Sequence, residues 1–453
     1  MRDDTLEWMP AREAVAAMTE GRISARDLTE ACLASIDRQE DTIGAWTWLD
    51  RDHALAQADA CDDLHRAGGP HGPLHGLPVG VKDIFDTHDM PTGDGTPLHA
   101  GRTPREDAAA VARLRQAGAI IMGKTVTTEL AVYHPGKTAN PQDPTRTPGG
   151  SSSGSAAAVA AGMVPLAIGS QTNGSVIRPA SYCGVVGYKP SFGLIPRTGV
   201  LRLSRLLDHV GVFARSVEDA ALIAECMIGY DPGDPDTSPR PVPHLAATAA
   251  AAPPVLPRLA FAPSPVWDQA DDETREAFGE LVAALGDRLD ETRGGKIEKL
   301  DLSDRFANAV AWHRTIMETD LAVNLVREYG EDGAGLSPVL RSMVERGRRE
   351  YSAFDYARAV EAIPVLNDAL DEIFFAYDAL ITPAAPGVAP KGLEATGSPV
   401  FCTLWTYCGM PAVTIPLLQS SDGLPIGVQL VGPRGSDARL LRTANWLANL
   451  DFD

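Results

Sequence analysis

Residues 148–159 read PGGSSSGSAAAV, a run of glycine and serine that passes directly into alanine. Runs of this composition are usually flexible linkers. Here helix-forming alanines follow at once, so we expect the run to open a buried helix over 155–161. A second seryl segment, SQTNGSVIRP, occupies 170–179, and a lysine closes the apolar stretch GLPVGVKD at 76–83. These three segments carry the argument for both fold and chemistry.

Regular elements are predicted on either side of these segments. Ser24 and Asp27 form a capping box ahead of an apolar helix, and Ser216 with Asp219 caps a helix over 220–227. The apolar patterns predict a helix at 108–116 and strands at 77–84, 119–122, 166–169, 379–382, 412–417 and 426–431. Helix and strand alternate, which predicts an α/β fold with a mixed β-sheet sandwiched between helices.

The 453 residues are interpreted as one domain, 1–453, built in several parts. The proline- and alanine-rich stretch at 230–260 is predicted to be a surface connection. The parts are N-terminal helices at 1–70, a catalytic core at 71–235, a helical insertion or cap at 262–376, and a C-terminal return to the core sheet at 377–453.

The amino-acid composition limits the kinds of partner that we expect for this protein. A net charge of −20 disfavours a phosphate backbone, so we expect no nucleic acid partner. No apolar run reaches the length of a membrane span, so no membrane partner is expected. Six cysteines without a CxxC pair, and a start without a secretory leader, indicate a reduced, cytoplasmic protein. Whether it forms a homodimer is left open.

Three patterns suggest other chemistry and are set aside. The histidines lack the HxxxH spacing of a metal hydrolase, so no metal is expected. Residues 118–125 match GxxxxGK[ST], but the apolar strand lies inside the motif instead of before it, so no nucleotide cofactor is expected. Asp208 and His209 suggest a Ser–His–Asp triad with Ser175, although a hydrogen-bonded pair within a loop is favoured.

One lysine and two serines suffice for a hydrolase. A serine hydroxyl needs a base within hydrogen-bond reach, and lysine can be that base once it is neutral. Burial on the apolar strand before Lys82 would lower its pKa, and a second serine can relay the proton. The turn 171–175 can offer backbone N–H groups to an oxyanion, because Asn173 and Gly174 both tolerate positive φ.

The three segments resemble the amidase signature family of Ser-cisSer-Lys hydrolases. The resemblance is densest at 76–218 and returns at 378–383 and 423–429. It implies a mixed sheet between helices and no cofactor. It further implies Ser175 as nucleophile, Ser151 as bridging serine after a cis peptide bond, Lys82 as general base, and the backbone N–H groups of Thr172, Asn173, Gly174 and Ser175 as oxyanion hole.

The chain departs from the family pattern near the nucleophile. Asn173 stands where many members have glycine, Gln171 replaces a common aspartate, and Arg178 lies three residues after Ser175 instead of two. The pattern resembles a malonamidase-like branch, in which this arginine would contact a substrate carboxylate. Alternatively, Arg178 braces the loop through carbonyl groups.

Three aromatic residues are candidate walls of the substrate pocket: Tyr133, Trp405 and Tyr407. Each could equally be an ordinary core residue.

The predicted reaction is hydrolysis of a carboxylic amide through a seryl acyl-enzyme. A small-molecule amide is the expected substrate, and carbamates, urethanes or esters share its carbonyl geometry. The alternative is a glutaminase subunit of a tRNA-dependent amidotransferase, which would need protein and RNA partners. A binding module without catalysis is a third interpretation.

Overall fold

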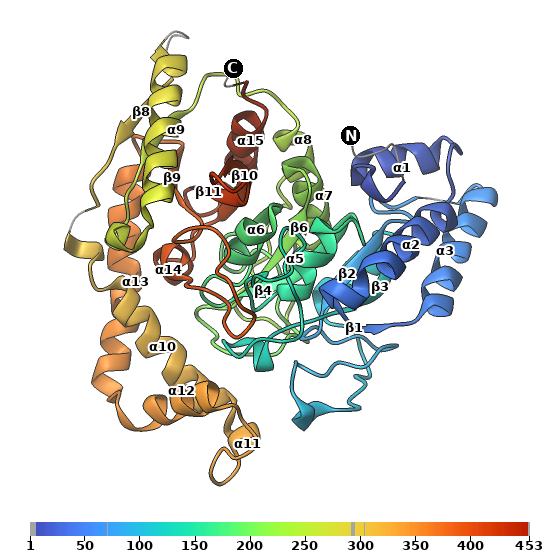
Figure 1. Ribbon diagram of the computed structural model, residues 1–453, viewed down its shortest axis with the longest axis horizontal. Helices are drawn as coiled ribbons and strands as arrows, with labels where there is room; N and C mark the ends of the chain where they lie inside the picture. Colours follow the sequence, from blue (N-terminus) through green and yellow to red (C-terminus); the bar gives the residue numbers. More distant parts are fainter. Residues whose placement is uncertain (1–5, 70, 291–294, 303, 452–453) are drawn as a thin grey trace.

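The computed structural model describes residues 6–69, 71–290, 295–302 and 304–451. These residues form one mixed, eleven-stranded sheet with helices packed around it (Figure 1), which confirms the predicted fold class. Across the sheet the strands are β1 (Trp46–Leu49), β3 (Ile120–Thr125), β2 (Pro78–Lys82), β4 (Leu166–Gln171), β6 (His209–Ala214), β5 (Val186–Lys189), β10 (Ala412–Gln419), β11 (Pro425–Val431), β9 (Ala379–Pro383), β7 (Arg258–Phe261) and β8 (Lys296–Lys299).

The helices cover both faces and both ends of this sheet (Figure 1). In chain order they are α1 (Ala11–Thr19), α2 (Ala25–Ile43), α3 (Arg51–Arg66), α4 (Ala109–Gln116), α5 (Ser153–Ala160), α6 (Ile177–Cys183), α7 (Val217–Met227), α8 (Leu245–Ala249), α9 (Asp272–Asp290), α10 (Ala309–Asn324), α11 (Val326–Tyr329), α12 (Pro338–Arg349), α13 (Ala353–Phe374), α14 (Val400–Tyr407) and α15 (Asp437–Ala448).

Strand direction changes across the sheet. β2 runs parallel to both of its neighbours, β3 and β4, and β7 runs parallel to β8 and β9. The other neighbouring strands are antiparallel. Because β2 lies between β3 and β4, the lysine at its end is surrounded by protein on both sides.

The helix predicted after the serine run exists and is deeply buried. α5 begins at Ser153, two residues before the predicted start, and all eight of its residues are buried. A Cβ on Gly154 would collide with the carbonyl oxygen of Ala45, so only glycine lets the chains approach this closely. Small side chains therefore bring the serine run close against the strands.

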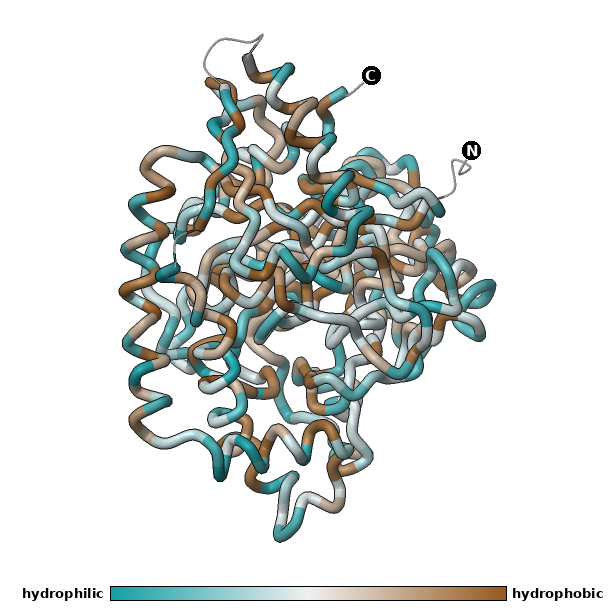
Figure 2. The backbone as a smooth tube through the Cα atoms, turned by 60° about the vertical axis from the view of Figure 1, so that its left-hand side comes forward, coloured by the Kyte–Doolittle hydropathy of each residue, from teal (hydrophilic) through white to brown (hydrophobic). Residues whose placement is uncertain are grey.

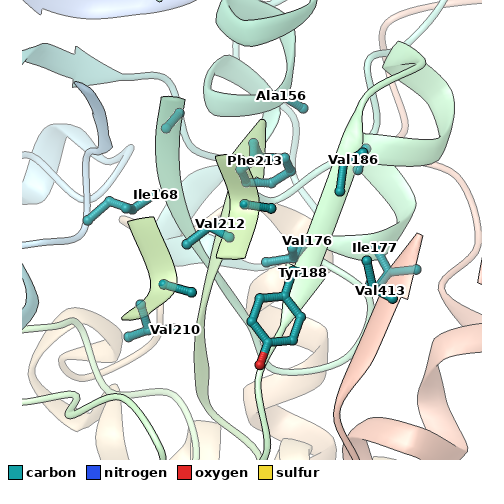
Figure 3. Packing of buried hydrophobic residues seen from close by; sticks show 14 of the residues in the cluster. Ala156, Ile168, Val176, Ile177, Val186, Tyr188, Val210, Val212, Phe213 and Val413 are labelled. Carbon is teal, nitrogen blue, oxygen red and sulfur yellow. The ribbon is translucent and has the colours of Figure 1, made fainter. Parts of the chain in front are cut away.

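The core lies where helices meet the central strands. Figure 3 shows Ile168, Val212 and Phe213 packed beside Ala156 and Val176, and every one of these side chains is fully buried. Figure 2 shows hydrophobic residues gathered in the interior, whereas the long peripheral helices alternate between hydrophobic and hydrophilic residues. None of the described helices has both the length and the hydropathy needed to cross a membrane.

Three strands and one helix lie where the sequence predicts a different structure, and β5, β6, α6, α14 and α15 are not among the predicted elements. β1 interrupts the N-terminal helices, while α8 and β7 fall in the stretch expected to be a surface connection. β8 joins the edge of the sheet within the mostly helical segment 262–376. These strands are four residues long, and pairing with a neighbouring strand determines them more than their own sequence does. The division of the chain at 262 and 376 stays a prediction.

Candidate active site

Lys82 ends β2 with its side chain fully buried. Its Nζ lies 2.7 Å from Ser151 Oγ and 2.8 Å from Ser170 Oγ. Burial lowers the pKa of Lys82 well below its ordinary value, and the charge of Asp208 opposes this shift only in part. Within the described residues no carboxylate lies at ion-pair distance from this amine, so it can hold a neutral, proton-accepting state.

Ser151 follows a cis peptide bond from Gly150, as the family resemblance implies. The carbonyl of Gly150 accepts a hydrogen bond from Arg178 Nη2, and the carbonyl of Ser151 accepts one from Thr128 N at 3.2 Å. Both peptide groups around the serine are therefore anchored, and its hydroxyl faces the lysine.

Arg178 is buried, and its two terminal guanidinium nitrogens donate to carbonyl and hydroxyl groups of the protein. Besides Gly150, its guanidinium donates to the Gly397 carbonyl at 2.8 Å and to Thr396 Oγ1 at 3.2 Å. Hydrogen bonds to carbonyl groups are what is expected if Arg178 braces the loop around Ser175. A contact between Arg178 and a substrate carboxylate stays a prediction.

Ser175 lies in the short loop between β4 and α6 and is nine-tenths buried. Gln171 organises this loop from the end of β4. Its Oε1 accepts from the backbone N–H groups of Val176 and Ile177, at 2.8 and 3.0 Å, and its Nε2 donates to Thr406 Oγ1 at 2.9 Å. A neutral glutamine side chain thus accepts from the backbone N–H groups at the start of α6.

Two carbonyl groups of the same loop accept hydrogen bonds from side chains outside the loop. His313 Nε2 donates to the carbonyl of Thr172 at 2.8 Å, and Thr406 Oγ1 donates to the carbonyl of Asn173. Because a trans peptide is planar, fixing these carbonyls turns the N–H groups of Asn173 and Gly174 the opposite way. Within the described residues neither N–H donates to a protein acceptor, as an oxyanion hole requires.

His313 was not found by sequence reasoning. It belongs to α10, which lies in the segment expected to be charged and mostly helical. Burial lowers the pKa of His313 to about 4, so the imidazole is a neutral donor at physiological pH. A single histidine on a helix gives no sequence signal for a contact with a loop so distant along the chain.

A cavity of about 410 Å³ opens beside Asn173, between α10, α12 and the start of α14. Tyr133, one of the predicted wall residues, lines it, and its hydroxyl accepts a hydrogen bond from Asn173 Nδ2 at 3.2 Å. Thr403 Oγ1 donates to Asn173 Oδ1 at 2.8 Å. The side chain that replaces a common glycine is therefore built into the cavity wall.

The other two aromatic candidates lie elsewhere. Trp405 is fully buried on α14, and neither it nor Tyr407 lines this cavity. The Tyr407 hydroxyl donates to the carbonyl of Ala359, and its ring lies 6.4 Å from that of Trp312. The structure places both aromatic residues in the core around α14.

The alternative triad is not assembled in the described residues. The carboxylate of Asp208 accepts from Thr172 Oγ1 at 2.7 Å and from the backbone N–H groups of Leu203 and Ser204. Nδ1 of His209 lies 2.7 Å from the carbonyl of Leu207, and no hydrogen bond from Nε2 to a catalytic serine is present in the part of the chain that the structure describes. Both residues thus bond mainly to neighbouring backbone.

One group of side chains has the spacing of metal ligands: His88, Asp89 and Asp107. Arg115 donates to both carboxylates, at 2.6 Å to Asp89 and 3.0 Å to Asp107. Arg115 occupies one oxygen of each carboxylate and offsets part of their charge, and the other oxygens lie 3.0 Å from ring nitrogens of His53 and His88, so these contacts account for the cluster without a metal ion.

Comparison with known proteins identifies the family. The model of the Amidase family matches residues 27–441. The chain belongs to the amidase signature family. It is therefore an enzyme of the class that cleaves C–N bonds in amides. The malonamidase-like branch is not indicated by the comparisons.

Curated relatives of this amidase include components of amidotransferases. The chain is 33% identical to a glutamyl-tRNA(Gln) amidotransferase subunit of Chloroflexus aggregans, over 97% of this chain and 96% of the relative. It is 35% identical to the protein of the same name from Anaeromyxobacter sp. (strain K), over 96% and 95%. These relatives overturn the exclusion of nucleic acid, and the restriction to small-molecule partners, that net charge suggested. Overall charge does not describe a local contact surface.

Solved structures show the same fold with several activities. A protein described as part of an unexpected vestigial complex, at the evolutionary origin of an s-triazine catabolic enzyme, superposes with a TM-score of 0.89, 31% identity, and 97% and 98% coverage. Peptide amidase from Stenotrophomonas maltophilia superposes with a TM-score of 0.83 and 29% sequence identity, and the match covers 97% of this chain and 96% of that enzyme. The glutamyl-tRNA(Gln) amidotransferase subunit from Thermotoga maritima superposes with a TM-score of 0.80 and 28% sequence identity, and the match covers 99% of this chain and 96% of that subunit.

Proposed function

We propose that this amidase cleaves its substrate through an acyl-enzyme on Ser175, with Lys82 as base and Ser151 as proton relay. One observation carries the proposal: a fully buried lysine amine lies 2.7 Å from the hydroxyl of Ser151. Burial lowers the pKa of Lys82, and this favours the neutral, proton-accepting amine that a lysine base requires.

The steps conserve every proton. Ser175 Oγ attacks the amide carbonyl and passes its proton through Ser151 to Lys82 Nζ. The N–H groups of the 172–175 loop stabilise the resulting oxyanion. The proton returns through Ser151 to the departing amine as the C–N bond breaks. Water then attacks the ester on Ser175 by the same route and releases the acid. Carbamates and esters present the same carbonyl, so they are further candidate substrates.

A second candidate function has support from the relatives. In that case the chain would be the amide-cleaving component of a glutamyl-tRNA(Gln) amidotransferase, with glutamine as a natural choice of amide. Identity of 33–35% along almost the whole chain favours this role. The chemistry on Ser175 would be unchanged, whereas the ammonia would be passed on and not released.

An assay of the isolated chain separates the two functions. Ammonia release is measured with aliphatic amides, a p-nitroanilide, a carbamate and glutamine. Turnover of simple amides without partners supports the free hydrolase. Turnover of glutamine only after the other amidotransferase components and charged tRNA are added supports the second role.

The nucleophile is tested in the same assay. Ser175→Ala should lower kcat by about 10⁴-fold or more and should abolish labelling by a fluorophosphonate probe. Wild-type protein that is labelled at another serine would contradict the proposal.

A further inference from the structure

Helix α10 contacts both the cavity beside Asn173 and the loop 172–175, which carries the proposed nucleophile. His313 of α10 holds the carbonyl of Thr172, and the next residue, Arg314, lines the cavity. Asn173, two residues before Ser175 in the same loop, also lines the cavity, so the cavity lies next to the loop that carries the proposed nucleophile. The apolar part of this cavity is formed by Val310, Met317 and Met343.

The positive and negative charges of the ionisable side chains around the cavity do not cancel. Glu318 is almost fully buried, and both of its oxygens are taken. Arg346 donates to them through Nε at 3.0 Å and through Nη2, and the Tyr351 hydroxyl donates at 2.8 Å. Glu318 and Arg346 thus neutralise each other, and His313 is uncharged.

Arg314 remains without a counter-charge. Its usual partner on a helix would be the carboxylate four positions on, which is Glu318. That carboxylate is already saturated by Arg346 and Tyr351. Within the described residues no carboxylate lies at ion-pair distance from Arg314, and its side chain is exposed at the cavity. The lining therefore carries one unmatched positive charge beyond an apolar stretch.

We propose that this cavity binds an acyl group with a carboxylate at its far end, held by Arg314. The substrate class is then the monoamides of dicarboxylic acids, with an apolar spacer between the reacting carbonyl and the carboxylate. A guanidinium suits this role because it binds a carboxylate through two parallel hydrogen bonds. The inference rests on the proposed function, since it places the amide at Ser175. It assigns the contact to Arg314 and not to Arg178, whose guanidinium is engaged by the protein.

Matched pairs of substrates test the proposal. Ammonia release is measured for the monoamides of glutarate and adipate, and for the uncharged pentanamide and hexanamide. Wild-type enzyme should prefer the anionic member of each pair by about tenfold in kcat/KM, mainly through KM. Arg314→Gln should remove this preference. An unchanged ratio in Arg314→Gln, or no preference in the wild type, would overturn the inference.

A control variant separates the contact from a general charge effect. Arg349→Gln makes the same change of charge at an exposed arginine on α12 that does not line the cavity. It should keep the wild-type preference. If Arg349→Gln loses the preference as Arg314→Gln does, long-range attraction explains the selectivity and the proposed contact is wrong.

Binding to a chain that cannot turn over gives an independent result. The monoamide of adipate is titrated calorimetrically into Ser175→Ala and into Ser175→Ala/Arg314→Gln. The second variant should bind about tenfold more weakly. Equal affinity, or no binding to either variant, overturns the inference. Selective binding without turnover by the wild type would instead uphold the pocket and refute the proposed hydrolysis.

Discussion

Lys82 and Lys124 lie near the ends of neighbouring strands, β2 and β3, and both are fully buried. Their surroundings differ. Lys124 Nζ donates to the Phe85 carbonyl at 2.8 Å and to Thr92 Oγ1 at 2.6 Å, and it lies 3.4 Å from a carboxylate oxygen of Asp83. Lys82 contacts only serine hydroxyls among the described residues.

The contrast shows that burial alone does not create a base. Desolvation lowers the pKa of both lysines, but Asp83 and other acidic groups oppose it at Lys124, whose pKa falls to about 8. At Lys82 burial lowers the pKa well below its ordinary value, and the charge of Asp208 opposes this shift. Carbonyl and carboxylate oxygens around Lys124 can only accept hydrogen bonds and so favour its charged form, whereas a serine hydroxyl can give or accept a proton.

Of the changes that test this comparison, replacement of Lys82 should lower the rate most. Lys82→Met keeps the apolar stem but removes the proton acceptor, so kcat/KM should fall by about 10³-fold or more. Steady-state kinetics on one amide substrate measure this effect. Residual activity within tenfold of the wild type would mean that another group is the base.

The pH dependence should follow the neutral form of Lys82. Its pKa is lowered, so the amine is neutral above that pKa and protonated below it, and kcat/KM should drop about tenfold per pH unit on the acid side. Asp208 raises this pKa, so Asp208→Asn should move the acid limb to lower pH. Rate profiles of both proteins provide the measurement. A shift to higher pH would contradict the assignment.

The contact between His313 and Thr172 should have a moderate effect. His313→Ala removes the donor that orients the peptide before Asn173, and kcat should fall about tenfold while KM changes little. His313→Gln can still donate a hydrogen bond and should recover part of the loss. If both variants change only KM, the histidine shapes the pocket and does not orient the loop.

Lys124 should matter least to the rate and most to stability. Lys124→Met leaves buried oxygen acceptors without their cation, and the free energy of unfolding should fall by about 3 kcal/mol. The acid limb of the rate profile should stay in place. Thermal unfolding and kinetics below the unfolding temperature separate the two effects. Loss of activity in a fully folded Lys124→Met protein would remove the distinction between the two lysines.

The sequence names a set of candidate catalytic residues, and their roles stay predictions. Lys82, Ser151 and Ser175 lie in motifs whose residue types and order indicate the chemistry, and alternating helices and strands indicate the sheet. The structure brings Lys82 and Ser151 into contact, as the motifs suggest.

The cavity wall could not be predicted in the same way. His313 and Arg314 belong to a helix whose neighbours are decided by tertiary packing, and an exposed arginine has the same pattern whether or not it faces a cavity. Trp405 is equally apolar as a core residue or as a pocket wall, so residue type did not place it. The four-residue strand β8 has partly exposed, charged residues and depends on β7 for its structure.

The single hydrogen bond from α10 to the carbonyl of Thr172 has a practical consequence for protein engineering. Helix α10 also bonds the 203–204 segment through Asp320 and Asn324, so an exchange of α10 and α12 between related enzymes should keep these residues as well as the histidine. Libraries confined to residues 310, 314, 317 and 343 would then alter substrate choice while leaving bond cleavage intact. Libraries in the tightly packed run 149–155 would mostly yield chains that fail to fold.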